Sequence, residues 1–222
     1  MERICDHAVW PERLITALAP AVAPRALPSY SEVLAELVEA EEREGWLARC
    51  MADGRYLALN VSFVATLAEH LRSLGNAPVL EICAGDGSLA RSLSQTGIEV
   101  VATDRKPPAG ARADVHTLAH SGALATYRPR VVLGSFVPAD AGIDRQVLES
   151  PHVLHYLVLN ARVGAEFGSS HLWSAAGWDR APLEAVTRWM LCRHDVWLGS
   201  AVPPLLHGEA WLFSRHADMR GR

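Results

Sequence analysis

A short apolar run enters a turn with two glycines and continues into a helical pattern, VLEICAGDGSLARSL over residues 79–93. Glycines let the chain turn sharply and bring backbone N–H groups close to a ligand, and the N-terminus of the following helix adds positive potential. Glu81 places an acidic side chain within the apolar run. The segment predicts a strand–turn–helix unit that binds a nucleotide-like ligand, although many α/β folds need glycines at such a turn for packing alone.

Apolar runs alternate with helical segments along the rest of the chain. The expected strands are Val79–Cys83, Ile98–Asp104, Pro129–Phe136 and His155–Val163, and the expected helices between them include Ser88–Thr96 and Gly142–Glu149. This alternation predicts βαβ units in a parallel sheet. Thr187–Trp197 and Glu209–Arg215 are rich in β-forming residues and flank a turn-prone stretch, so we expect the sheet to finish with an antiparallel pair.

Helical patterns also precede the first strand. Pro11–Ala19 could form one short helix, an amphipathic helix begins at Ser31 and fades near Gly45, and Leu57–Leu74 carries an apolar stripe that ends at Gly75-Asn76. We therefore expect an N-terminal helical segment over residues 1–76, acting as a lid or cap, and a ligand-binding domain over 77–222.

Composition and charge exclude several classes of protein. A length of 222 residues suits one full domain with an appendage, and 50% hydrophobic with 21% charged residues is typical of a globular chain rather than a disordered one. The formal charge of -4 gives no basic surface for long nucleic acid.

The spacing of the cysteines and the composition of the N-terminus indicate the cellular compartment in which the protein is expected. Cys5, Cys50, Cys83 and Cys192 are far apart with no C-x-x-C pair, so we expect neither a metal site nor a disulfide framework. The N-terminus lacks the apolar region of a signal peptide, and no apolar run approaches the ~20 residues of a membrane span. The expected location is the cytoplasm, without a membrane partner.

Asp104 ends the second predicted strand, 17 residues after Gly87, where nucleoside-binding α/β domains place a carboxylate for ribose hydroxyls. With this residue, the sequence resembles the class I (Rossmann-like) S-adenosylmethionine (SAM)-dependent methyltransferase family. The family pattern is E-x-G-x-G-x-G followed by an acidic residue that closes the second strand. Here the loop reads EICAGDG over residues 81–87, with Cys83 where the family usually has its first glycine.

The resemblance covers roughly residues 50 to 216. It implies a three-layer α/β fold with a mostly parallel, seven-stranded sheet and an antiparallel last strand, preceded by N-terminal helices. A dinucleotide dehydrogenase pattern, G-x-G-x-x-G/A, also fits Gly85, Gly87 and Ala90, so the glycines alone do not exclude that family. Glu81 before the loop and the antiparallel tail favour the methyltransferase interpretation.

The resemblance also implies SAM as cofactor and assigns residues to it. Glu81, Gly85 and Gly87, with Cys83 and Ala84 in the same loop, belong at the methionine end; Asp104 belongs at the ribose and Arg105 beside the adenine. Ser135 and Phe136 should face the methyl group. Asp114 matches a position that commonly meets the adenine amino group, and an ordinary surface carboxylate is an equal alternative. Tyr56, next to Arg55, is expected to close over the SAM carboxylate.

The acceptor is less constrained by the sequence. The stretch SFVP, residues 135–138, does not match the signature of amide or adenine amino methylation, and Pro138 does not precede the cysteine that cytosine C5 methylation requires. The candidate general bases are His171, His155 and Glu166, although histidines at such positions are more often surface or satisfied residues.

The predicted function is therefore SAM-dependent methyl transfer to an O, N or C nucleophile of a small-molecule acceptor. Two alternatives stay open: a SAM-binding protein that does not methylate, and a methyltransferase-fold scaffold that no longer binds the cofactor. Long nucleic acid is not expected as a partner, and a homodimer is considered as an assembly.

Overall fold

A computed structural model describes residues 26–38, 45, 48–50, 52, 54–112, 114–139, 141–163, 166–193, 195 and 206–216. The helices are α1 (Tyr30–Val38), α3 (Val61–Ser73), α4 (Ser88–Gln95), α5 (His120–Tyr127), α6 (Ile143–Glu149), α7 (Ser170–Ser174) and α8 (Glu184–Thr187). The strands are β1 (Val79–Ile82), β2 (Val100–Asp104), β3 (Val115–Thr117), β4 (Val131–Ser135), β5 (His155–Val163), β6 (Glu166–Phe167), β7 (Trp178–Pro182) and β8 (Leu206–Arg215).

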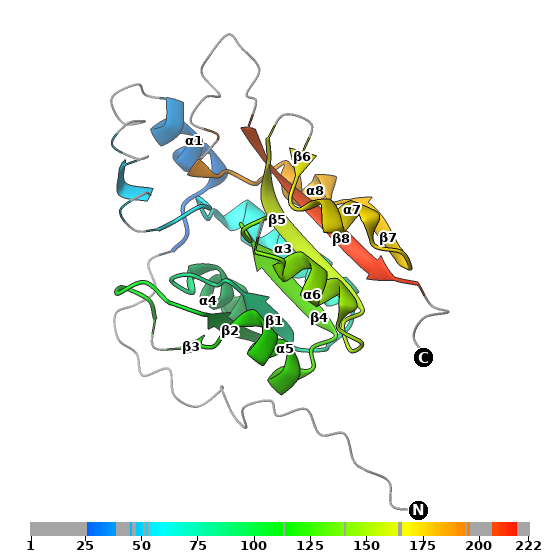
Figure 1. The fold of residues 1–222 in the computed structure, drawn as a ribbon. Helices are drawn as coiled ribbons and strands as arrows, with labels where there is room; N and C mark the ends of the chain where they lie inside the picture. The colour runs from blue at the N-terminus through cyan, green and yellow to red at the C-terminus, as the bar shows by residue number, and fades with distance from the viewer. Residues whose placement is uncertain are drawn as a thin grey trace, which may run out of the picture.

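The strands form one sheet in the order β3-β2-β1-β4-β5-β8-β7, and the two-residue β6 pairs with β5 beside this path (Figure 1). The five strands β3, β2, β1, β4 and β5 run parallel to one another, and β8 runs antiparallel to both β5 and β7. This confirms the predicted fold class, a mostly parallel sheet whose last strand in sequence is antiparallel.

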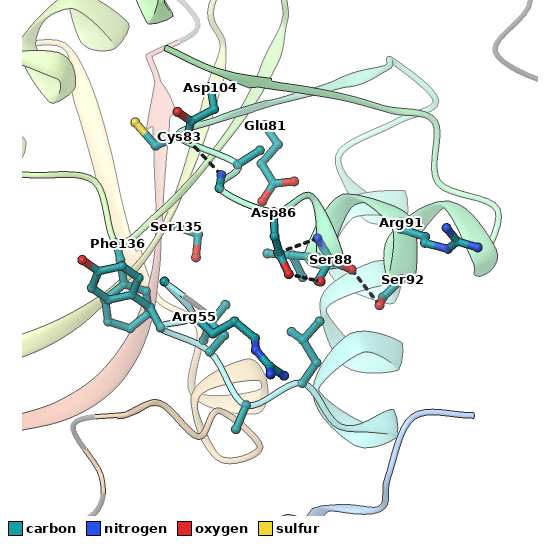
Figure 2. A pocket seen from close by; sticks show the side chains of 18 of the residues that line it. Arg55, Glu81, Cys83, Asp86, Ser88, Arg91, Ser92, Asp104, Ser135 and Phe136 are labelled. Carbon is teal, nitrogen blue, oxygen red and sulfur yellow. Dashed lines mark hydrogen bonds between the residues drawn. The ribbon is translucent and has the colours of Figure 1, made fainter. Parts of the chain in front are cut away.

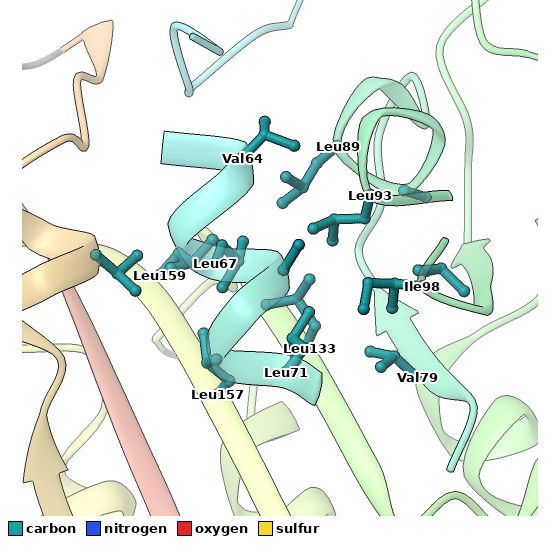
Figure 3. Close-up of a cluster of buried hydrophobic side chains, with 14 of the residues drawn as sticks. Val64, Leu67, Leu71, Val79, Leu89, Leu93, Ile98, Leu133, Leu157 and Leu159 are labelled. Carbon is teal, nitrogen blue, oxygen red and sulfur yellow. The ribbon is translucent and has the colours of Figure 1, made fainter. Parts of the chain in front are cut away.

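Helices cover both faces of the sheet because alternate strand residues point to opposite sides. Along β5, Leu157 and Leu159 join the core that lies under α3, α4 and α8, whereas Tyr156 and Val158 join the core under α5, α6 and α7. Figure 3 shows the first core, in which α3 packs on the strands beside α4. The chain is thus a three-layer α/β structure.

The N-terminal region is partly as predicted. Helix α1 forms within the expected amphipathic segment, and the proposed helix at Pro11–Ala19 lies outside the described residues. Helix α3 begins at Val61 rather than near Leu57, because the Asn60 side chain caps it by accepting from the Phe63 N–H at 2.9 Å. Since α3 lies directly on the sheet, the division at residue 77 stays a prediction.

The antiparallel tail differs from the sequence-based expectation. The partner of β8 is β7, Trp178–Pro182, and not the segment that begins at Thr187, because Thr187 ends helix α8. Strand β7 lies at the sheet edge with only Trp178 buried, so it lacks the apolar pattern of a central strand. Within the described part of the chain, no helix is long and apolar enough to span a membrane.

Candidate functional site

A cavity of about 1390 Å³ lies at the carboxyl ends of β1, β2 and β4. Strand order reverses between β1 and β4, since β2 and β3 lie on one side of this pair and β5 on the other. Ligands of open α/β sheets bind at such a switch point. Figure 2 shows Cys83 after β1, Asp104 at the end of β2 and Ser135 at the end of β4 around this space.

The two glycines of the first turn have different roles. Both adopt positive φ angles, +56° at Gly85 and +76° at Gly87. A Cβ atom on Gly87 would lie 2.5 Å from Val115 Cγ2, so this glycine is needed for close packing of β3. A Cβ atom on Gly85 would meet no described atom within 4 Å, and Gly85 lines the cavity. The chain therefore leaves space at Gly85 that a ligand can fill.

Asp104 fixes the turn and still faces the cavity. Its Oδ2 accepts from the Gly85 N–H at 3.0 Å, and its Oδ1 accepts from the Lys106 N–H at 2.8 Å. Because each carboxylate oxygen accepts more than one hydrogen bond, Asp104 has capacity left for hydroxyl donors of a ligand. The residue joins the ends of β1 and β2 and offers a polar group to the cavity.

Glu81 is a buried carboxyl group in the cavity wall, 1% exposed. The Ala90 N–H, in the first turn of α4, donates to it, but Oε2 has no hydrogen-bond partner among the described residues. Burial, with smaller contributions from Asp86 and Asp104, raises the pKa of Glu81 to about 8. In the ligand-free protein the group is therefore mostly protonated at neutral pH, and a cationic ligand beside its unpaired oxygen would favour the carboxylate form.

Cys83 and Phe136 directly follow β1 and β4, the two strands at the switch point, and both have strained backbone conformations. Their φ angles are +55° and +50°, in the left-handed region that residues with a side chain rarely occupy. At Cys83 this explains why the family pattern usually has glycine. Non-glycine residues held in this region are concentrated at functional sites.

Cys83 should react slowly with alkylating reagents despite lining the cavity. Burial, with Asp104 and Asp144, raises the pKa of its thiol from 9.0 to about 11. Since the thiolate is the nucleophile, we expect alkylation by iodoacetamide at pH 8 to be about 100-fold slower than for an unperturbed thiol. Mass spectrometry of the peptide that contains Cys83 measures this rate, with the unfolded chain as control. A rate equal to that of the unfolded chain would contradict the assignment.

An aromatic stack forms the cavity wall next to Ser135. The rings of Tyr56 and Phe136 lie 5.1 Å apart with 25° between their planes, and the Arg193 guanidinium lies 3.6 Å from the centre of the Tyr56 ring. Hydrogen bonds from the Arg193 N–H to the Tyr56 carbonyl and from the Ala58 N–H to the Leu191 carbonyl hold the segment before α3 against residues 191–193. These contacts hold Tyr56 in its stacked position on Phe136.

Most of the sequence-predicted cofactor residues come together at this cavity. The lining includes Tyr56, Glu81, Cys83, Ala84, Gly85, Asp104, Arg105, Ser135 and Phe136. Gly87 packs against β3 instead. Asp114 precedes β3 by one residue and does not line the cavity.

The structure does not bring the two predicted histidine bases to the cavity. His155 starts β5 opposite Val131, the first residue of β4, so it lies at the far end of the strands from Ser135, 3.1 Å from the Ser214 hydroxyl. His171 lies in α7 beside a separate cavity of about 310 Å³. The backbone of Glu166, in β6, pairs with that of Val163 at the end of β5, and the role of Glu166 as a base stays a prediction.

Sequence reasoning missed two lining residues that follow β3, Leu118 and His120. The Leu118 N–H donates to the Asp104 carbonyl at 2.9 Å, and His120 Nε2 is buried without a partner among the described residues. The rule that ligands lie beyond the carboxyl ends of strands could have found them, because it favours residues after β3 over Asp114 before it.

Comparisons with known proteins give matches among solved structures, whereas neither a protein-family model nor a curated protein matches the sequence. Magnesium protoporphyrin IX methyltransferase from Synechocystis, solved with bound SAM, is 15% identical, with 87% of this chain and 100% of that chain covered at a TM-score of 0.46. The plantazolicin methyltransferase BpumL, in complex with S-adenosylhomocysteine (SAH), is 10% identical, with 84% and 98% covered at 0.46. A Burkholderia thailandensis 1,6-didemethyltoxoflavin N1-methyltransferase is 15% identical, with 92% and 98% covered at 0.40.

The fold itself rests on the sheet and the first turn of this chain. Five parallel strands are followed by an antiparallel last strand inserted between β5 and β7, and the glycine turn after β1 faces the acidic end of β2. With this sheet and this turn, the chain has the Rossmann-like fold of the class I SAM-dependent methyltransferases.

Proposed function

We propose that this protein is a SAM-dependent methyltransferase that acts on a small-molecule acceptor. The observation that carries the proposal is the turn after β1, where the open space over Gly85 meets the Asp104 carboxylate at the switch point of the sheet. Space for a ligand and a ribose-binding carboxylate are what a nucleoside cofactor requires here.

The residues present fit SAM. Asp104 would accept from the ribose hydroxyls, and Leu118 and His120 would flank the adenine from the end of β3. Glu81, whose Oε2 is buried and unpaired among the described residues, would receive the ammonium group of the methionine end. Ser135 and Phe136 would border the methyl group, because they end the strand next to β1.

Bound SAM supplies an electrophilic methyl group on a sulfonium. The chain's own contribution is to align an acceptor with that group and to exclude water, since such a displacement depends mainly on proximity and orientation. Neither His155 nor His171 lines the cavity, so we assign neither of them a catalytic role. A formal charge of -4 favours a small acceptor over long nucleic acid, and the wide spacing of the four cysteines favours a cytoplasmic location.

Calorimetric titration with SAH tests the cofactor assignment. We expect binding by the wild-type protein and a loss of about 10- to 100-fold in Asp104→Ala, because hydrogen bonds to a charged group contribute ~1.5–3 kcal/mol. Asp179→Ala is the matched control, since this carboxylate is exposed on β7 and pairs with His216 away from the cavity.

Each result has a distinct meaning. Absence of SAH binding by the wild-type protein would overturn the proposal in favour of a scaffold without cofactor. Binding without methyl transfer across a broad acceptor panel would favour a SAM-binding protein that does not methylate.

A further inference from the structure

The cavity has more room than one cofactor needs. Ligand pockets for a single small molecule have volumes of about 300–1,000 Å³, and this cavity has a volume of about 1390 Å³. Its lining also differs in character from place to place. Asp86 and Ser88 line it at the glycine turn and Asp104 at the end of β2, whereas its apolar lining residues include Tyr56, Leu57, Phe136, Pro138 and Ile143, with Arg55 next to Tyr56 in the chain.

We propose that the stacked pair Tyr56–Phe136 is the binding platform for the acceptor, and that the acceptor is a planar, largely apolar aromatic molecule. This inference rests on the proposed function, because it assigns the second ligand of the same cavity. Figure 2 shows Phe136 on the far side of Ser135 from Asp86 and Ser88, so its ring lines the cavity away from the glycine turn.

The conformation of Phe136 supports a binding role. Its φ of +50° is unfavourable for a bulky side chain, and the Phe136 N–H donates to the Leu159 carbonyl at 2.7 Å. That hydrogen bond ties the strained residue to β5, so the ring is held at the cavity wall. The ring also packs against the core beside α3 and α4, and non-glycine residues with such strained backbones are concentrated at ligand-binding sites.

The surroundings of Tyr56 keep the platform rigid. Its ring contacts Phe136 and the Arg193 guanidinium, and its carbonyl accepts from the Arg193 N–H at 2.8 Å. Even so, Tyr56 is 39% exposed. Because Arg193 lies over the Tyr56 ring and Phe136 stacks on it, the exposed part of this fixed pair is suited to an edge-to-face contact with an aromatic ligand.

The test uses a matched pair of probes on the full chain saturated with SAH. One probe is 2-naphthol and the other is decahydro-2-naphthol, which has the same carbon skeleton and hydroxyl group without the aromatic rings. Calorimetry gives the ratio of their affinities in the wild type, in Phe136→Leu and in Trp173→Leu. Leucine keeps an apolar side chain at the same strained position, and Trp173 is a partly exposed aromatic residue outside the cavity.

We expect the ratio to favour 2-naphthol in the wild type and to fall about 2- to 10-fold in Phe136→Leu, the range for one aromatic pair. Trp173→Leu should keep the wild-type ratio. Tyr56→Leu is the second variant and should lower the ratio in the same direction if Phe136→Leu does not fold.

Two results would overturn the platform: an unchanged ratio in the platform variants, or no binding of 2-naphthol to the wild-type SAH complex. SAH affinity is measured separately for every variant. A wild-type protein that binds SAH but shows no aromatic preference refutes the platform alone, whereas a wild-type protein that does not bind SAH refutes the proposed function.

Discussion

Gly85→Ala should weaken SAH binding by about 100-fold while costing only about 1 kcal/mol of stability. The added methyl group would enter the cavity, where no described atom lies within 4 Å of it, so the folded chain tolerates it but a ligand at the turn does not. This loss of affinity lies in the upper part of the ~1–3 kcal/mol of free energy that an extra methyl group costs in a well-packed site. The stability cost comes from placing alanine at a φ of +56°.

Gly87→Ala is the matched variant because it adds the same methyl group two residues away. Its Cβ would lie 2.5 Å from Val115 Cγ2, so we expect a loss of about 3 kcal/mol in the free energy of unfolding and little change in SAH affinity of the folded protein. Urea unfolding and SAH calorimetry on both variants measure the two effects. If both glycines changed affinity equally, the separate roles given to them would be wrong.

The stability of the wild-type protein without ligand should fall, relative to Glu81→Gln, as pH rises from about 5 to 8. Because the pKa of Glu81 rises from 4.5 to about 8 on folding, the folded state binds more protons than the unfolded state between these values. Each pH unit in this range then removes up to about 1.4 kcal/mol of folding stability. Glutamine has nearly the same shape and does not titrate. We therefore expect the free energy of unfolding of the variant, relative to that of the wild type, to rise by about 3 kcal/mol between pH 5 and pH 8.

Urea unfolding at pH 5, 6, 7 and 8 measures this difference. Glu184→Gln, at an exposed position in α8, is the control and should show no comparable trend. A difference between wild type and Glu81→Gln that is constant with pH would show that Glu81 ionises normally in the folded protein.

The central strands could be predicted because they are buried on both faces and read as continuous apolar runs. The sequence predicts strands over Val79–Cys83 and Pro129–Phe136 in this way, and the structure has them at Val79–Ile82 and Val131–Ser135. Asp104 is conspicuous because a carboxylate at the end of such a run is hard to place in a core. Strand β7 was not found, because an edge strand with one buried residue has no such pattern.

The candidate site could be predicted where its residues are close in sequence, and less well where the fold brings distant segments together. Glu81 and Gly85 lie in one short segment, at the end of β1 and in the turn that follows, so the family pattern identifies them. The contact of Arg193 with Tyr56, and of Tyr56 with Phe136, joins three segments that no sequence spacing relates. His155 was chosen for its chemistry, but the direction of its strand places it at the opposite end of the sheet.

The position of β8 has a consequence for synthesis on the ribosome. This strand is made after all the other described strands of the sheet, yet it pairs with β5 over nine residues and is the sole described partner of β7 on the path of the sheet. Until residues 206–215 have left the ribosomal tunnel, β5 is an open edge whose Leu157 and Leu159 belong to the buried core, and β7 has no strand to join. The nascent chain can therefore form the parallel half early, but it remains prone to aggregation until β8 arrives.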